Sequence, residues 1–170
     1  QLAPKRCGHT RGKAVVARDE ALRRVEAACD ARDEIRAKGL YGGNDVAIVA
    51  RTDANGVLGF EEAVERCRLF RDLGADLTFL EAPRSVEEMR AYCDAVDGPK
   101  LANMLEGGHT PILAPAELGR IGYALAAYPV TLLSASVKAM QHALDKLRSC
   151  SSSSSADLLL PFPELCTAVG

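Results

Sequence analysis

The chain has 170 residues, a formal net charge of −2 at pH 7 and 48% hydrophobic residues, enough for one domain with a hydrophobic core. Because basic residues are not in excess, the composition argues against a nucleic-acid partner. No apolar run reaches the roughly 20 residues that cross a bilayer, so the sequence predicts no membrane-spanning segment.

Six cysteines are present, and none forms a C-x-x-C pair that would indicate zinc. Cys29, Cys67 and Cys93 fall on apolar faces of predicted helices, where a free cysteine behaves as a small hydrophobic residue. This usage favours an intracellular reducing compartment, such as the cytoplasm, a plastid or a mitochondrion, and leaves extracellular disulfides as the alternative.

Four short apolar runs alternate with helical patterns after a first predicted helix. That first helix covers 19–38 and ends at Gly39. The predicted strands lie within 45–54, 76–83, 100–104 and 122–129. The helices after them are predicted at 60–73, from a Ser85 capping box to 96, at 115–120, and from the last strand to about 148.

Repeated strand–helix units indicate a parallel sheet with crossover helices, and short apolar strands are typical of strands buried on both faces. Polar residues follow the strands: Arg51 and Asp53 the first, Glu81 the second, and Asn103 and Glu106 the third. In a (β/α)₈ barrel this end holds the active site. No glycine-rich phosphate-binding sequence follows a strand, so the pattern favours a TIM-type barrel over a doubly wound sheet.

A complete barrel has eight strands in about 250 residues, so four strand–helix units predict only part of one. We expect residues 1–148 to form the C-terminal half of a (β/α)₈ barrel. Residues 149–156 are predicted to be a serine-rich linker, and 157–170 a tail in which PFPELCTAV forms a terminal helix.

The stretch PKRCGHTRGK places Cys7 among basic residues and beside a Gly-His pair. Lys5, Arg6 and His9 favour the thiolate, and Gly8 lets the backbone approach a ligand closely. Such a cysteine can act as an acid, a base or a nucleophile. The alternative is a surface cysteine near the chain end, among charges that are merely solvated.

Other candidate residues come from the strand ends and the last helix. Arg51 follows VAIVA, where a charge is costly unless it meets an anion, so it either binds a carboxylate or pairs structurally with Asp53 or Glu81. Glu81 likewise either contacts the substrate or forms a structural ion pair. Asn103 can donate to a substrate carboxylate or cap a loop, and Lys138 is either solvated or reaches an anion. The set suits a small polycarboxylate, and no acidic or histidine group has metal-ligand spacing.

KRCGH at Lys5 to His9 resembles the signature loop of the isocitrate lyase/phosphoenolpyruvate mutase superfamily. The similarity continues in order through VARTDA, GADLTFLEAP, NMLEGGHTP and AYPVTLL. The chain resembles most closely the branch that contains 2-methylisocitrate lyase, dimethylmalate lyase, oxaloacetate hydrolase and the petal death protein.

The resemblance implies a (β/α)₈ barrel that uses Mg²⁺ to cleave a C–C bond in a 2-hydroxy di- or tricarboxylate, such as 2-methylisocitrate, an alkylmalate or oxaloacetate. A base removes the hydroxyl proton, and the bond breaks in retro-aldol fashion. The family cysteine, which corresponds to Cys7, then protonates the carbanion.

The resemblance also assigns substrate contacts and a metal. Substrate-binding positions of the family correspond to Lys5, Gly8, His9, Arg51, Glu81, Asn103, Met104 and Lys138. The lyases often carry arginine at the position of Lys138, so lysine there keeps the charge but loses the bidentate fork. The family's Mg²⁺ ligands lie upstream of Gln1. The 170-residue polypeptide alone is therefore expected to be inactive, and the full-length protein to be a homo-oligomer.

Two other interpretations remain open. The first is a phosphonate mutase or hydrolase that acts on a P–C bond, similar to carboxyvinyl-carboxyphosphonate phosphorylmutase. The mutase branch lacks the cysteine loop, so Cys7 favours a lyase. The second is a truncated, non-catalytic half-barrel that associates with a full-length homologue through its unpaired strand edges.

Overall fold

The computed structural model describes residues 1–6, 12–39, 46–149 and 159–170. It divides into two compact units, 1–129 and 130–170. The second unit begins just before helix α5 (Thr131–Arg148), which has no buried residue. Most of the predicted serine-rich linker, 150–156, lies outside the described residues.

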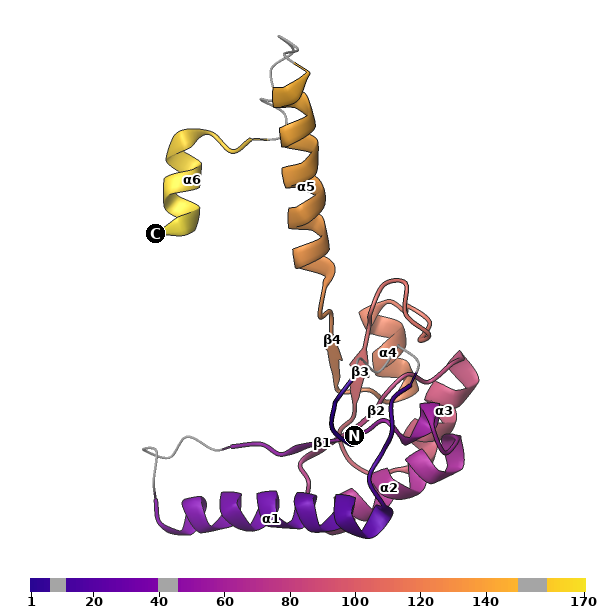
Figure 1. Ribbon diagram of the computed structural model, residues 1–170. Helices are drawn as coiled ribbons and strands as arrows, with labels where there is room; N and C mark the ends of the chain where they lie inside the picture. Colours follow the sequence, from indigo (N-terminus) through magenta and orange to yellow (C-terminus); the bar gives the residue numbers. More distant parts are fainter. Residues whose placement is uncertain (7–11, 40–45, 150–158) are drawn as a thin grey trace. The chain divides into compact units, whose positions relative to one another are not determined.

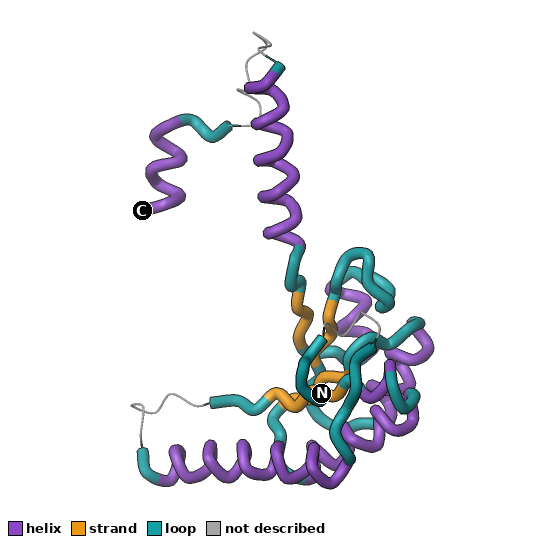
Figure 2. The backbone as a smooth tube through the Cα atoms, in the orientation of Figure 1, coloured by secondary structure: helices purple, strands orange, loops and turns teal. Residues whose placement is uncertain are grey.

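The first unit alternates helices and strands in the predicted order (Figures 1 and 2). Its elements are α1 (Arg18–Ala37), β1 (Val49–Thr52), α2 (Phe60–Asp72), β2 (Leu77–Leu80), α3 (Val86–Ala95), β3 (Leu101–Asn103), α4 (Pro115–Ile121) and β4 (Leu125–Ala127). A short 3₁₀ turn, η2 (Ala54–Gly56), follows β1 and was not predicted.

Local sequence signals set the helix ends. Gly39 (φ +62°) and Gly74 (φ +93°) adopt the left-handed conformation just after α1 and α2, which glycine accepts without a steric penalty. At the start of α3, the Ser85 hydroxyl accepts a hydrogen bond from the Glu88 N–H (3.2 Å), which confirms the predicted cap. The Glu88 carboxylate accepts from the Arg84 N–H at 2.7 Å.

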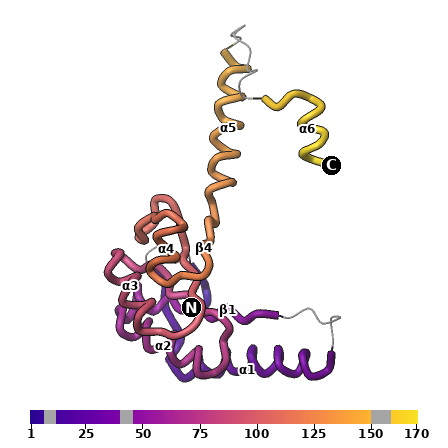
Figure 3. Tube along the Cα trace, turned by 180° about the vertical axis from the view of Figure 1, so that it is seen from behind, coloured from indigo at the N-terminus to yellow at the C-terminus, as the bar shows by residue number. Residues whose placement is uncertain are grey.

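The four strands run parallel and follow one another in chain order. β1 pairs with β2, β3 pairs with β4, and a parallel bridge between Thr78 and Lys100 joins the two pairs. Helices α2, α3 and α4 gather on one side of these strands in both the front and the rear views (Figures 1 and 3). The predicted parallel α/β arrangement is confirmed, and within the described residues the strands do not close into a barrel.

The prediction that every strand is buried on both faces is wrong for β1 and β4. Exposed and buried residues alternate along β1, where Val49 is 42% exposed, and Leu125 of β4 is 50% exposed. Successive side chains of a strand point to opposite faces. The helices cover one face, and the described residues leave part of the other face uncovered.

The largest core of the first unit lies between the strands and helices α2, α3 and α4. Its fully buried members include Leu80, Met89, Tyr92 and Met104. Cys67 lies in this core with no exposed surface, as its place on the apolar helix face predicted. A smaller cluster packs against α1 and contains residues from β1 and α2.

The second unit contains α5 and the terminal helix α6 (Phe162–Val169), which confirms the predicted helix in the tail. The predicted apolar face of α5 is solvent-exposed; its members are Leu133, Val137, Met140, Leu144 and Leu147. In the part of the chain that the structure describes, no helix combines the length and apolar character needed to cross a membrane.

Candidate active site

The carboxyl ends of β1, β2 and β3 bring three predicted site residues together. Parallel strands end at the same edge of a sheet, so Arg51, Glu81 and Asn103 become neighbours although they are far apart in sequence. The Arg51 Nη2 atom lies 3.3 Å from Glu81 Oε2, and the Asn103 amide donates to Glu81 Oε1 at 3.3 Å. Glu81 is 1% exposed and forms the centre of the group.

Arg51 also makes a bidentate pair with Asp53. Its Nε and Nη2 atoms donate to the two carboxylate oxygens, each at 3.0 Å. The guanidinium carbon lies 4.9 Å from the centre of the Phe79 ring, which adds a cation–π contact. Structural ion pairing, one of the two alternatives for Arg51, is therefore present. Because the side chain is still 39% exposed, this pairing leaves the guanidinium accessible to a solute anion.

The turn after Glu81 is held by a buried amide. Ala82 has a positive φ of 57°, which is unusual for a residue other than glycine. The Asn55 Nδ2 atom donates to the Ala82 carbonyl at 2.8 Å and lies 3.4 Å from Glu88 Oε2. The start of α3 and the turn after β1 thus fix the backbone that presents the Glu81 carboxylate.

The described charges at this edge are balanced. Asp53 and Glu81 supply two buried carboxylates, and Arg51 and Lys13 supply two cations, with Lys13 Nζ 3.9 Å from Asp53 Oδ1. Burial raises the pKa of Asp53, but hydrogen bonds from Arg51 and Gln1 outweigh it and hold that pKa below its ordinary value. Asp53 is therefore ionised at neutral pH and compensates the nearby cations.

The structure places the other predicted residues elsewhere or does not describe them. Met104 is fully buried in the core, and Lys5 is exposed near the chain start. Lys138 belongs to α5 in the second unit. Cys7, together with its Gly-His neighbours at 8–9, lies outside the described residues. The roles assigned to all of these residues stay predictions.

Four described residues of the site received no functional role from the sequence: Gln1, Lys13, Asp53 and Asn55. A signal existed for Asp53, because residues two apart on a strand point to the same face, and Asp53 follows Arg51 by two. Gln1 and Lys13 meet Asp53 from distant positions and left no local pattern.

The described residues do not fit a Mg²⁺ site. Mg²⁺ in proteins is held by carboxylates and water. Within the described ranges, no group of three or more His, Cys, Asp or Glu side chains is arranged to hold a metal ion. The two carboxylates at the strand ends, Asp53 and Glu81, are both engaged by Arg51.

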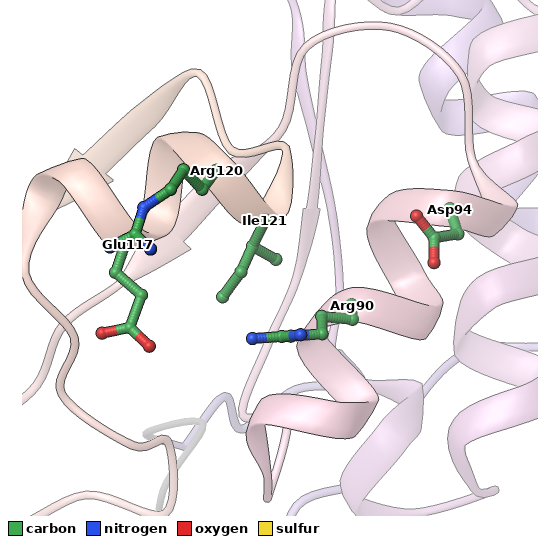
Figure 4. A pocket seen from close by; sticks show the side chains of 5 residues that line it. All are labelled: Arg90, Asp94, Glu117, Arg120 and Ile121. Atoms are coloured by element: carbon green, nitrogen blue, oxygen red, sulfur yellow. The ribbon is translucent and has the colours of Figure 1, made fainter.

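A separate cavity of about 380 Å³ lies between α3 and α4 (Figure 4). It is lined by Arg90, Asp94, Glu117, Arg120 and Ile121. Figure 4 shows Arg90 reaching from α3 toward the α4 side chains. Two basic and two acidic residues leave this lining without net charge.

The sequence pattern of a family described as phosphoenolpyruvate phosphomutase matches residues 10–148. The chain belongs to this family. The match covers all four strand–helix units and the residues at the strand ends. It confirms the predicted superfamily.

Two of the similar proteins are lyases by name. The chain is 42% identical over 147 residues to 2-methylisocitrate lyase from Aeropyrum pernix, covering 86% of this chain and 44% of that protein. It is 39% identical over 140 residues to 2,3-dimethylmalate lyase from Eubacterium barkeri, covering 82% and 45%. The chain spans less than half the length of these two curated relatives.

A solved structure agrees with these matches. The structure of oxaloacetate acetylhydrolase in complex with 3,3-difluorooxalacetate superimposes with a TM-score of 0.86 at 35% identity. The match covers 99% of this chain and 56% of that one.

Proposed function

We propose that this chain is the cysteine-bearing part of a carbon–carbon lyase that cleaves a small 2-hydroxy di- or tricarboxylate. One observation carries the proposal: Arg51, Glu81 and Asn103 converge at the carboxyl ends of three parallel strands, with the Arg51 guanidinium partly open to solvent. The names of the relatives support the same chemistry, since two are lyases of branched hydroxy acids.

The described residues would bind and orient the substrate. Because Asp53 holds the Nε and Nη2 atoms of Arg51, the exposed part of the guanidinium would meet a substrate carboxylate through its other N–H groups, and the Asn103 amide would add a donor. Glu81 accepts from Asn103 and faces Arg51, so it fixes the direction of both donors. A ligand with two carboxylates in this geometry is held with its reacting bond in a defined place.

The chemical step assigned to this chain is proton delivery by Cys7. After a base removes the hydroxyl proton, the C–C bond breaks and yields an α-keto acid and a carbanion stabilised by its carboxylate. Cys7 then gives its thiol proton to the carbanion carbon, and the thiolate recovers a proton from solvent. No step is assigned to Mg²⁺, because the described residues do not form its ligand set.

The proposal also includes the fold: this chain forms half of a (β/α)₈ barrel. Four parallel strands in chain order, with helices on one side, are half of the eight units of a (β/α)₈ barrel. The partly exposed faces of β1 and β4 fit a sheet that continues in the complete protein. The 170-residue chain alone is then inactive, and the complete protein is a homo-oligomer.

The test assays a panel of substrates. The protein is expressed together with any coding sequence that lies upstream of Gln1. We expect turnover of 2-methylisocitrate, 2,3-dimethylmalate or oxaloacetate in the presence of Mg²⁺, measured as α-keto acid or oxalate released. The 170-residue chain alone serves as the negative control. Lyase turnover by that chain alone would contradict the half-barrel proposal.

A second candidate is a phosphonate mutase or hydrolase, which the description of the matching family favours. The same panel includes phosphonopyruvate, with phosphorus NMR to follow the P–C bond. Conversion of phosphonopyruvate without cleavage of any hydroxy acid would replace the lyase proposal with this one.

A further inference from the structure

Asp53 is a buried carboxylate that contacts three separate parts of the chain. It is 5% exposed and receives two hydrogen bonds from Arg51. The Gln1 Nε2 atom donates to its Oδ1 atom at 2.9 Å, and Lys13 Nζ lies 3.9 Å from the same oxygen. One carboxylate therefore joins the end of β1 to residues on both sides of segment 7–11.

The two flanks of segment 7–11 are also bound to each other. The Leu2 N–H donates to the Ala14 carbonyl at 2.8 Å, and the Arg6 N–H donates to Gln1 Oε1 at 2.9 Å. The Gln1 side chain is thus a bridge, because its oxygen accepts from Arg6 while its amide donates to Asp53. The Leu2–Ala14 bond thus joins the two flanks, and Gln1 ties the first flank to Asp53.

Lys13 is fixed by packing as well as by charge. Its side chain is 6% exposed. It lies so close to Gly56 that a Cβ atom there would come within 2.7 Å of the Lys13 Cε atom. Gly56 belongs to the turn η2, which directly follows Asp53. The Lys13 ammonium is therefore held between the η2 backbone and the Asp53 carboxylate.

We propose that Asp53 is a positioning residue that fixes residues 1–6 and 12–14, the described flanks on either side of Cys7, relative to the Arg51 guanidinium. Its role in catalysis rests on the lyase function proposed above. The carboxylate does not meet the substrate itself, because Arg51, Gln1 and Lys13 occupy its surroundings. It sets the relation between Arg51 and these two flanks.

The first test needs no turnover and uses amide hydrogen exchange on the 170-residue chain. In Asp53→Asn, we expect exchange at residues 2–6 and 12–14 to become about tenfold faster, the scale of one lost charge-assisted hydrogen bond. Exchange in α3 stays unchanged. Asp76→Asn is the matched control, because Asp76 makes a similar pair with Arg32 beside the other end of β2.

A second variant covers the case in which Asp53→Asn does not fold. Lys13→Met removes the ammonium and keeps most of the chain length, and it is expected to speed exchange at residues 2–6 in the same direction. Unchanged exchange in a folded Asp53→Asn chain, or an equal effect of Asp76→Asn on these amides, would overturn the proposal.

The kinetic test separates this proposal from the lyase function. In the complete protein, Asp53→Asn is expected to lower kcat by about ten- to a hundredfold, since small misplacement of reacting groups has effects of that size. KM also rises, because Asp53 accepts two hydrogen bonds from Arg51, so the comparison is made with kcat at saturating substrate. If the wild type shows no lyase turnover, the lyase function fails. The exchange experiment still decides whether Asp53 fixes residues 2–6 and 12–14. A normal kcat with faster exchange would overturn the catalytic part.

Discussion

The Arg51 Nη2 atom lies 3.3 Å from Glu81 Oε2, so the ends of two neighbouring strands are tied by an ion pair. The two partners differ in accessibility: the Glu81 side chain is 1% exposed and the Arg51 side chain 39%. Glu81 is consequently a buried anchor, and the guanidinium is the part of the pair that a dissolved carboxylate can reach.

Arg51→Lys keeps the charge and removes the fork. We expect KM for the lyase substrate in the complete protein to rise about ten- to a hundredfold, because an ammonium lacks the directed N–H groups with which the guanidinium holds Asp53 and Glu81 and still meets a substrate carboxylate. The kcat value changes less. Arg120→Lys on the surface of α4 is the control. Equal KM values for Arg51→Lys and the wild type would show that Arg51 is purely structural.

A buried hydroxyl pair in the core gives a stability prediction. The Thr78 hydroxyl lies 2.6 Å from the Tyr92 hydroxyl, and both side chains have no exposed surface. Tyr92→Phe leaves the Thr78 hydroxyl without this partner and is expected to lower the free energy of unfolding by about 1–3 kcal/mol. Urea unfolding measures the change, with Tyr128→Phe as the exposed control.

The same pair allows a rescue experiment. Adding Thr78→Val to Tyr92→Phe removes the second hydroxyl as well, so part of the lost stability is expected to return. If the two changes in the free energy of unfolding are simply additive, the Thr78 and Tyr92 hydroxyls do not interact.

Asp76 makes stability depend on pH. Burial raises its pKa, but hydrogen bonds from the Ile48 N–H (2.7 Å) and from Arg32 (2.6 Å) outweigh it and hold the pKa below the ordinary 3.8. A lowered carboxyl pKa gives stability that is present above the unfolded-state pKa and is lost as the pH falls through the folded-state pKa. Asp76→Asn should therefore destabilise the chain at about pH 7, and much less at about pH 3.

Urea unfolding of wild type and Asp76→Asn at both pH values measures this difference. Asp30→Asn, a substitution on the exposed side of α1, is the control and should show little effect at either pH. A destabilisation by Asp76→Asn that is the same at low and neutral pH would contradict the assigned ionisation.

The described cysteines are expected to react with N-ethylmaleimide in a fixed order. Burial raises the pKa of Cys67 to about 12 and that of Cys93 to about 11, whereas Cys166 on α6 is exposed. The thiolate is the reactive form, so Cys166 should be modified first, and Cys67 only after unfolding. Peptide mass spectrometry checks the order. Fast modification of Cys67 in the folded chain would contradict its burial in the core.

Much of the fold was predictable because its signals are local. Helical spacing in 60–73 and the glycines at 39 and 74 determine where helices form and end. The meeting of Arg51, Glu81 and Asn103 was also predictable, although they are distant in sequence. Parallel strands place their carboxyl ends at one edge, so the fold class alone brings these residues together.

Other features depend on contacts that leave no local pattern. Gln1 and Asp53 are 52 residues apart, and neither residue type nor spacing indicates that they bond. Met104 follows Asn103 directly but points into the core, because neighbouring strand positions face opposite sides. The apolar runs of β1 and β4 gave no sign that one face would be partly exposed, since covered and uncovered apolar faces have the same composition.

The assigned role of Cys7 is tested most directly by measuring lyase turnover of Cys7→Ser in the complete protein, compared with the wild type and with Cys166→Ser. Cys166 is an exposed cysteine on α6, so its substitution controls for general effects of losing a thiol. We expect Cys7→Ser to lose turnover by about a hundredfold or more, within the range of lost general acid catalysis, while Cys166→Ser stays near the wild type. Wild-type turnover by Cys7→Ser would contradict the central claim that this chain supplies the proton donor of a lyase.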